Sequence, residues 1–247
     1  MSSKISSSNL ALLHNLPAAK KPSSEPAKPL RSKRRTPSIT ASYVKQQAAG
    51  KAAASSEELT VKFETLEGCK LGISRYPDFG YNAKGGIGTA AVGRADDKSE
   101  TATADDVLPV SFDIGTLYIP PLTGATTKFL GLPLPPFLKI AIVPEIFRGI
   151  IGRGTGKVEL QFRAKFLFSA GSIYRAPPLM VETTLTSEES KGAMREGRGE
   201  RMDGGGRCKL VGVAVVDPID DILMNSFLRL PTECIAILNA KISISSP

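Results

Sequence analysis

The clearest pattern in the chain is a strict alternation of apolar and polar residues from Val158 to Phe168. The apolar positions are Val158, Leu160, Phe162, Ala164, Phe166 and Phe168, and the polar positions between them are Glu159, Gln161, Arg163 and Lys165. Successive side chains of a β-strand point to opposite faces of the sheet. This period of two therefore predicts a strand with one buried face and one solvated face.

Weaker strand patterns lie on both sides of this segment. The other predicted strands are Leu59–Leu66, Lys70–Ser74, Val107–Ile119, Leu179–Leu185, Lys209–Val216 and Ile235–Ile244. The first two flank the dipeptide Glu67-Gly68, so we expect them to form a hairpin. Short strands separated by Gly, Pro and Asp predict a mainly β fold, namely a single antiparallel β-barrel or sandwich domain.

One helix is predicted at about residues 218–230. Asp217 is the expected N-cap, Pro218 the first helical residue, and Pro231 the residue that ends the helix. The apolar residues at helical spacing are Ile219, Ile222, Leu223, Phe227 and Leu230, and we expect them to pack on the sheet. Two segments rich in Gly and charge, Gly80–Thr103 and Ser187–Gly206, are expected to be exposed, mobile loops.

The first 56 residues have a different composition from the rest of the chain. They are rich in Ser, Ala and Pro and hold ten Lys or Arg residues against one acid, Glu25. Such a segment is expected to be disordered and is typical of a chloroplast transit peptide, with cleavage within about residues 40–54. The destination would be the stroma or the stromal face of the thylakoid. A mitochondrial address, a nuclear-localisation cluster at Arg31–Arg35 and a solvated tail are the alternatives.

The charge distribution bears on the choice of partner. The chain has a formal net charge of +8, but residues 57–247 hold slightly more acidic than basic residues. A nucleic-acid partner is therefore not expected for the mature domain, and it would require the basic tail to be retained.

Several kinds of chemistry are excluded by the residues available. His14 is the single histidine and lies in the predicted transit peptide, so residues 57–247 cannot form a catalytic site that depends on histidine. Cys69, Cys208 and Cys234 lack metal-ligand spacing, and we predict neither a metal site nor a cofactor.

Two glycine-rich segments resemble nucleotide-binding motifs only superficially. Gly149–Lys157 has Ile151 at the first glycine position of a phosphate-binding loop and leads into a strand rather than a helix. Gly85–Gly93 has Ala91 where the last glycine of a dinucleotide fingerprint would stand. We interpret the first as a flexible turn that enters the strand, and we predict no dinucleotide site at the second.

The least ordinary segment is Phe129–Ile151, which is overwhelmingly apolar but interrupted by prolines and three charges. Such a segment can cover the core, line a pocket for an apolar ligand, or rest on a membrane or a partner protein. The candidate ligand-binding residues are the apolar Phe129, Leu132, Leu134, Phe137, Ile140, Ile142 and Phe147, with Lys139, Arg148 and Arg153 as cations for a headgroup or acidic partner.

The sequence thus favours a non-enzymatic plastid protein that binds a lipid or another hydrophobic small molecule. A thylakoid membrane surface or a photosynthetic complex is the other partner that this segment would fit. A histidine-free enzyme acting inside a β-barrel is the alternative, with Tyr76, Tyr81, Tyr118, Tyr174 and Arg175 as its first candidates. A nucleic-acid binder that uses the basic N-terminal tail is the second alternative.

Overall fold

The computed structural model describes residues 59–73, 75–92 and 106–246. The predicted transit peptide and its cleavage window lie outside the described residues, as does most of the C-terminal half of the expected loop 80–103. The described residues form mostly antiparallel β-structure with one short helix, which confirms the predicted fold class.

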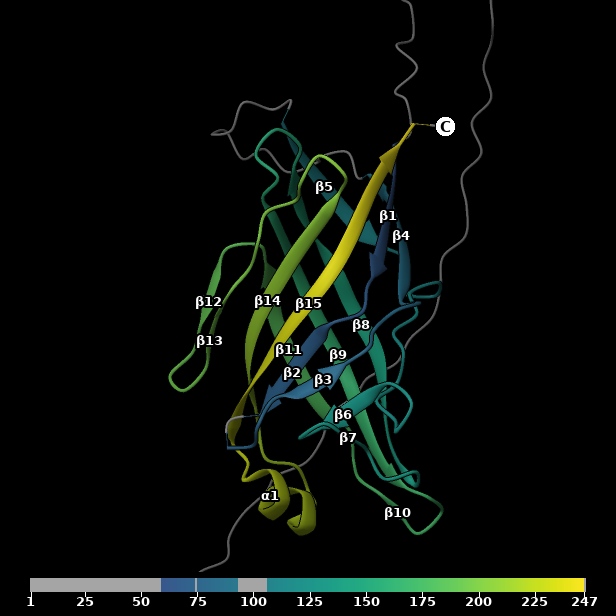
Figure 1. The fold of residues 1–247 in the computed structure, drawn as a ribbon, viewed down its shortest axis with the longest axis vertical. Helices are drawn as coiled ribbons and strands as arrows, with labels where there is room; N and C mark the ends of the chain where they lie inside the picture. Colours follow the sequence, from purple (N-terminus) through teal and green to yellow (C-terminus); the bar gives the residue numbers. More distant parts are fainter. Residues whose placement is uncertain (1–58, 74, 93–105, 247) are drawn as a thin grey trace, which may run out of the picture. The chain divides into compact units, whose positions relative to one another are not determined.

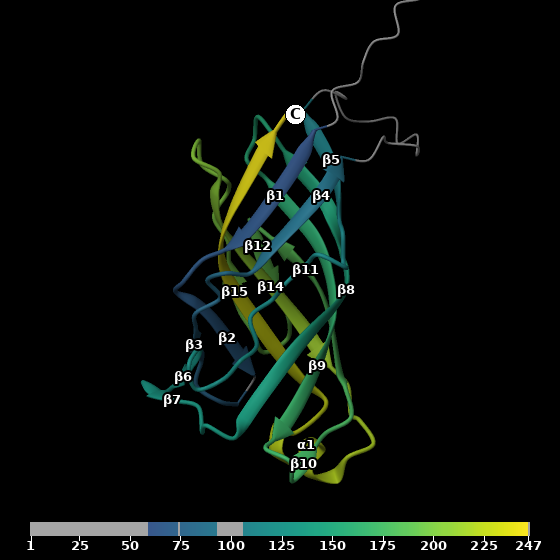
Figure 2. The ribbon, with the colours of Figure 1, turned by 90° about the vertical axis from the view of Figure 1, so that its right-hand side faces the viewer.

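Eight strands form a ring of antiparallel pairs (Figures 1 and 2). In order around the ring they are β1 (Thr60–Thr65), β4 (Ile87–Val92), β5 (Val107–Phe112), β8 (Leu138–Gly152), β9 (Val158–Ala170), β11 (Leu179–Thr186), β14 (Arg207–Val216) and β15 (Thr232–Ser245). The last strand pairs with the first, with Ile242 opposite Phe63. The sheet is therefore closed as a barrel, of a size that can hold side chains or one small ligand.

Strand β15 pairs with two different strands along the length of one edge. β1 lies along the C-terminal half of β15, whereas β2 (Cys69–Ile73) lies along its N-terminal half, with Ile73 opposite Cys234. The predicted hairpin of these two segments is wrong, because both pair with β15 and they follow each other end to end. Gly68, with φ of 78°, makes the bend between them.

A branch of short strands continues from β2 through β3 (Phe79–Tyr81), β6 (Thr127–Phe129) and β7 (Leu132–Pro133). The segment before β6 also contacts the barrel, because Leu122 forms an antiparallel bridge with Ile140 on β8. We call the end of the barrel that holds α1 (Ile222–Leu228), β10 (Tyr174–Arg175) and the β6–β7 turn the helix end. The end with the β8–β9 turn, residues 153–157, is the far end.

Two expected loops contain strands. The segment Gly80–Thr103 contributes part of β3 and all of β4, and Ser187–Gly206 contains a hairpin of β12 (Glu189–Lys191) and β13 (Glu196–Arg198). This hairpin packs outside the barrel, where a Cβ on Gly197 would lie 2.7 Å from Val211 Cγ2. The glycines that suggested a loop are needed for this close approach.

Strand β9 confirms the alternation in the sequence, because Leu160 and Ala164 are buried while Arg163 and Lys165 form outer ion pairs with Glu145. Strand β8 runs through the proline-containing segment and was not among the predicted strands. Its pairing with β9 shifts register between Pro144 and Ile146, and such a bulge accommodates a residue that lacks a backbone N–H.

The predicted helix exists, but it begins four residues later than expected. Asp221, and not Asp217, is the N-cap, and its carboxylate accepts a 2.8 Å hydrogen bond from the Met224 N–H. Arg229 ends the helix in the left-handed conformation. Met224 and Leu228 pack against the barrel, whereas Ile222, Leu223 and Phe227 remain exposed.

The half of the barrel toward the far end is filled by aromatic side chains. Phe147 lies at the centre of this cluster, with ring centroids 5.1 Å from Phe63, 4.5 Å from Phe112 and 6.0 Å from Phe162. Ile151, Leu160 and Leu210, all fully buried, surround this aromatic cluster. The half toward the helix end is not filled in this way.

Candidate functional site: an apolar cavity in the barrel

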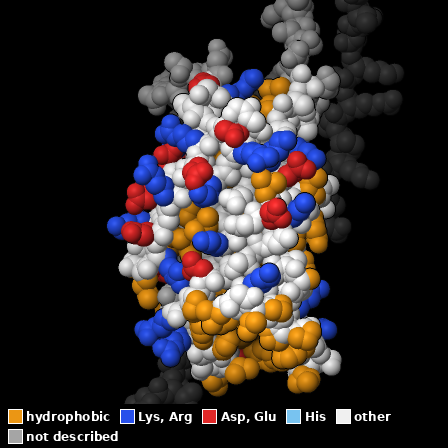
Figure 3. Space-filling model, viewed as in Figure 1, with side chains coloured by type: hydrophobic (Ala, Val, Ile, Leu, Met, Phe, Trp, Pro, Cys, Tyr) orange, Lys and Arg blue, Asp and Glu red, His pale blue; other side chains and the backbone are white. Residues whose placement is uncertain are grey.

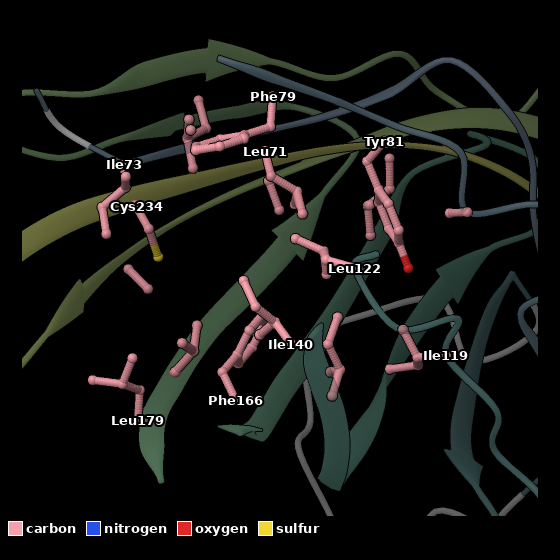
Figure 4. A pocket seen from close by; sticks show the side chains of 18 of the residues that line it. Leu71, Ile73, Phe79, Tyr81, Ile119, Leu122, Ile140, Phe166, Leu179 and Cys234 are labelled. Atoms are coloured by element: carbon pink, nitrogen blue, oxygen red, sulfur yellow. The ribbon is translucent and has the colours of Figure 1, made fainter. Parts of the chain in front are cut away.

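A cavity of about 460 Å³ lies inside the barrel between the aromatic cluster and the helix end (Figure 4). Its wall comes from every strand of the ring except β5, from β2, β3 and β6, from the segment before β6, and from α1. The labelled side chains around it include Leu71, Phe79, Tyr81, Leu122, Ile140 and Phe166. Ligand sites in proteins commonly measure about 300–1,000 Å³, so the volume is sufficient for a small molecule.

Small residues on neighbouring strands explain why this half of the barrel is hollow. Gly212 and Ala214 on β14 and Ala236 on β15 line the cavity. Side chains on alternate positions of a strand share a face, so 212 and 214 point inward together. Protein interiors are normally packed with few voids larger than a water molecule. A cavity of this size is therefore a specific feature of the barrel.

The cavity wall carries no charged side chain. Most of its hydroxyl groups donate to backbone carbonyl oxygens: Thr65 to Ala83 at 2.5 Å, Thr183 to Val213 at 2.8 Å, Tyr76 to Phe227 at 2.6 Å, and Tyr81 to Pro120. Burial raises the pKa of Tyr81 well above its usual value, so its phenol stays neutral. A buried carboxylate would find no partner here, and the wall therefore suits a neutral apolar molecule.

Cys234 directs its sulfur into the cavity from β15 (Figure 4). Burial raises the pKa of its thiol to about 11, and burial also raises the pKa of Cys69 and that of Cys208, the latter to about 12. All three cysteines are free. At neutral pH they are protonated thiols, and Cys234 contributes a small apolar surface to the wall.

The cavity reaches the protein surface beside α1. Phe227 lines the cavity and is also 55% exposed, so it lies between the interior and solvent. Tyr76, in the turn between β2 and β3, lines the cavity too, and its hydroxyl donates a 2.6 Å hydrogen bond to the Phe227 carbonyl oxygen. Helix α1 therefore lies at a mouth of the cavity and is hydrogen-bonded to the β2–β3 turn.

The β2–β3 turn, which contacts α1 through Tyr76, is in turn bound by the β12–β13 hairpin. Arg195 directs Nη1 to Asp78 at 2.8 Å and Nη2 to the carbonyl oxygens of Ile73 and Tyr76, at 3.1 and 2.9 Å. Glu233 on β15 in turn holds the tip of the hairpin. Its buried carboxylate accepts backbone N–H bonds from Ala193, Met194 and Arg195 at 2.6, 2.7 and 2.8 Å. These bonds, that of Met194 foremost, lower the pKa of Glu233.

The structure divides the residues predicted to bind a ligand into three groups. Phe129, Leu134, Ile140, Ile142 and Phe147 line the cavity. Leu132 and Phe137 are exposed apolar side chains at the helix end. The three cations are exposed and contribute nothing to the cavity wall: Lys139 and Arg148 lie on β8, and Arg153 follows it at the far end. Arg148 donates to Gln161 Oε1 on the outer face of the barrel at 3.2 Å.

Most of the wall comes from strands that the sequence analysis did not connect with a site. Examples are Leu71 on β2, Phe166 and Phe168 on β9, and Leu179 on β11. The inward face of β9 was visible as the alternation, but an alternating pattern does not distinguish a filled core from a lined cavity. The small residues Gly212, Ala214 and Ala236 on other strands were the only sequence signal for a cavity.

The residues considered for catalysis are divided between the cavity and the helix end. Tyr76, Tyr81 and Tyr118 line the apolar cavity, where no carboxylate or amine faces them. Tyr174 lies at the helix end, where burial and its 2.8 Å hydrogen bond to Asp221 raise its pKa to about 12. Arg175, beside it, is exposed. General acid–base chemistry most often uses a histidine, a carboxylate or an amine within reach of the reacting atom, and the cavity wall carries none of these side chains.

Within the described ranges, no cluster of three or more His, Cys, Asp or Glu side chains is arranged to hold a metal ion. The helical part of the described chain is too short to cross a membrane. Comparison of the chain with protein-family models, with curated proteins and with solved structures found no match.

Proposed function

We propose that this protein binds a neutral, apolar small molecule or lipid inside its β-barrel and acts without catalysis. The cavity of about 460 Å³ with no charged residue in its wall carries this proposal. Burial of apolar surface provides about 25 cal/mol per Å², so a molecule that buries a few hundred Å² gains several kcal/mol. The engaged hydroxyl groups of Thr65, Thr183 and Tyr81 offer little to a polar ligand, so shape and apolarity would determine selectivity.

The proposed location is the chloroplast, in the stroma or on the stromal face of the thylakoid. The Ser-rich, acid-poor composition of residues 1–56 supports this part of the proposal. Imaging of a C-terminal fluorescent fusion in plant cells, with sizing of the accumulated product, tests it. A full-length nuclear or cytosolic product would contradict it and would return attention to the basic tail.

The binding itself is tested with N-phenyl-1-naphthylamine, a neutral apolar probe that becomes fluorescent in an apolar environment. We expect saturable binding of one probe molecule per chain. Methyl palmitate should displace the probe at least about 10-fold more effectively than palmitate, because burying the carboxylate costs more than 1.4 kcal/mol when it has no partner. Absence of saturable binding, or equal competition by the ester and the acid, would contradict the proposal.

A further inference from the structure

The helix end of the barrel exposes apolar side chains from several separate elements. We call Leu130, Leu132, Phe137, Ile173, Ile222 and Leu223 the apolar rim; Ile173 is 95% exposed and Ile222 is 86% exposed. They come from the β6–β7 turn, the segment before β8, the β9–β10 turn and α1. Figure 3 shows hydrophobic side chains gathered over this end of the molecule, whereas charged side chains dominate the surface above it.

The positions of these residues are unusual for apolar side chains. Leu130 and Gly131 occupy a tight turn with φ of 51° and 82°, where Asn-Gly or Asp-Gly is the common choice. Ile173 lies in the turn that leads from β9 to β10. On α1, Met224 and Leu228 already pack against the barrel, so Ile222 and Leu223 are apolar on the outer face as well. None of these side chains is needed for the core.

Basic residues lie on the elements of the helix end together with the apolar rim. The elements of the helix end carry Arg75, Lys128, Lys139, Arg175 and Arg229, none of which forms an ion pair within the described residues. Four carboxylates lie on the same elements: Asp78 pairs with Arg195, Asp221 is engaged as the helix cap, and Asp217 and Asp220 precede α1. Basic residues therefore outnumber the acids at this end, whereas residues 57–247 as a whole carry a slight excess of acids.

We propose that the apolar rim docks the protein onto the surface of an anionic lipid bilayer. Apolar tips on separate elements enter the boundary between headgroups and acyl chains, and the surrounding cations contact lipid phosphates and other anionic headgroups. Side chains that project from several separate elements suit a deformable surface better than the flat, closely packed face of a protein partner. This docking does not depend on the proposed function of the cavity.

Docking in this orientation would also bring the cavity mouth to the bilayer, and this second step rests on the proposed function. Phe227, on the same helix as Ile222, both lines the cavity and is exposed. A lipid leaving the bilayer beside α1 would pass this ring without crossing bulk water. The rim thus provides a route by which a water-insoluble ligand enters the barrel.

The chain has no tryptophan, so a single introduced indole reports the environment of one position. In the full chain, Ile222→Trp and Ile173→Trp place the probe on the rim, and Ile150→Trp places it on the exposed face of β8 toward the far end. Vesicles of phosphatidylcholine and phosphatidylglycerol at a 7:3 ratio should shift the emission of the two rim probes to shorter wavelength. Brominated acyl chains should quench these probes and leave Ile150→Trp unaffected.

A second measurement gives the strength of docking. The triple variant Ile173→Ser, Ile222→Ser, Leu223→Ser should bind these vesicles at least about 30-fold more weakly than the wild type in sedimentation assays, because three apolar side chains no longer enter the bilayer. The matched control Val107→Ser, Ile150→Ser removes exposed apolar side chains at the far end and should bind as the wild type does.

The basic segment 1–56 can itself attract anionic vesicles. If it alone were responsible, the rim probes would keep the emission that they have in water and the triple variant would bind as the wild type does, and either result would overturn the proposal. Binding of N-phenyl-1-naphthylamine in the absence of vesicles reports the cavity separately. Loss of vesicle binding with retained probe binding, or the reverse, identifies which of the two proposals fails.

Discussion

The hydroxyl group of Tyr76 donates a 2.6 Å hydrogen bond to the carbonyl oxygen of Phe227, and the two rings lie 5.8 Å apart. This contact joins the β2–β3 turn to helix α1 across the mouth of the cavity. A single neutral hydrogen bond contributes about 1 kcal/mol, which is small enough to break and form repeatedly at room temperature. The mouth can therefore be closed at rest and still admit a ligand.

Removal of this hydrogen bond should accelerate exchange of a bound molecule. In Tyr76→Phe, the ring contact is kept and only the hydroxyl is lost, so α1 should open more often and N-phenyl-1-naphthylamine should dissociate about 5-fold faster in stopped-flow experiments. Tyr118→Phe is the matched control, because Tyr118 also lines the cavity and its hydroxyl makes no hydrogen bond within the described residues. Equal dissociation rates for the two variants would show that the contact does not control exchange.

Glu233 should stabilise the fold in a manner that depends on pH. Its pKa is lowered in the folded protein by three backbone N–H bonds, so the unfolded chain takes up the proton first on acidification. The stabilisation is fully present above the unfolded-state pKa of about 4.3 and is lost as the pH falls through the folded-state value. Glu233→Gln should therefore melt at a lower temperature than the wild type at pH 7.

The difference in melting temperature between wild type and Glu233→Gln should shrink as the pH is lowered below about 4. Circular dichroism melts at a series of pH values measure it. Glu189→Gln, at an exposed position of the same hairpin, is the matched control and should melt as the wild type does. A difference for Glu233→Gln that stays constant at all pH values would contradict the assigned role of its carboxylate.

Cys234 should react slowly with thiol reagents at neutral pH. The thiolate is the reactive form, and with a pKa of about 11 only about one thiol in a thousand is ionised at pH 8. The rate of modification by N-ethylmaleimide should rise about 10-fold per pH unit from pH 8 to pH 10, and a saturating amount of N-phenyl-1-naphthylamine should slow it. Peptide mapping by mass spectrometry, with Cys234→Ser as the control, identifies the site. Rapid modification at pH 7 would contradict the buried environment.

The sequence predicted the strands with a regular alternation but not the pairing of non-local segments. Strand β9 was recognisable because its inward residues follow a strict period of two. The pairing of β2 with β15 joins Ile73 to Cys234, and no local signal marks a contact over such a separation. Strand β8 was obscured by Pro144, whose position at a bulge depends on the partner strand. The helix began at Asp221 because its side chain caps Met224, although Asp217-Pro218 has the stronger local signal.

The cavity was predicted only in part. The apolar segment 129–151 was recognised as a candidate lining, and five of the seven apolar residues named in it as candidates do line the cavity. Its volume, however, depends on Gly212, Ala214 and Ala236 lying opposite large side chains on other strands. The sequence shows that these residues are small, but only the register of the sheet shows that they face a common space.

Filling that space tests the central claim most directly. Ala214→Phe places a ring in the cavity, and Val215→Phe places the same ring on the outer face of the same strand. Fluorescence titration of the full chain with N-phenyl-1-naphthylamine should show at least about 10-fold weaker binding for Ala214→Phe, since displacing two buried methylene equivalents of the ligand costs about 1.6 kcal/mol. Val215→Phe should bind as the wild type does. Unchanged affinity in a folded Ala214→Phe variant would show that the cavity is not the binding site.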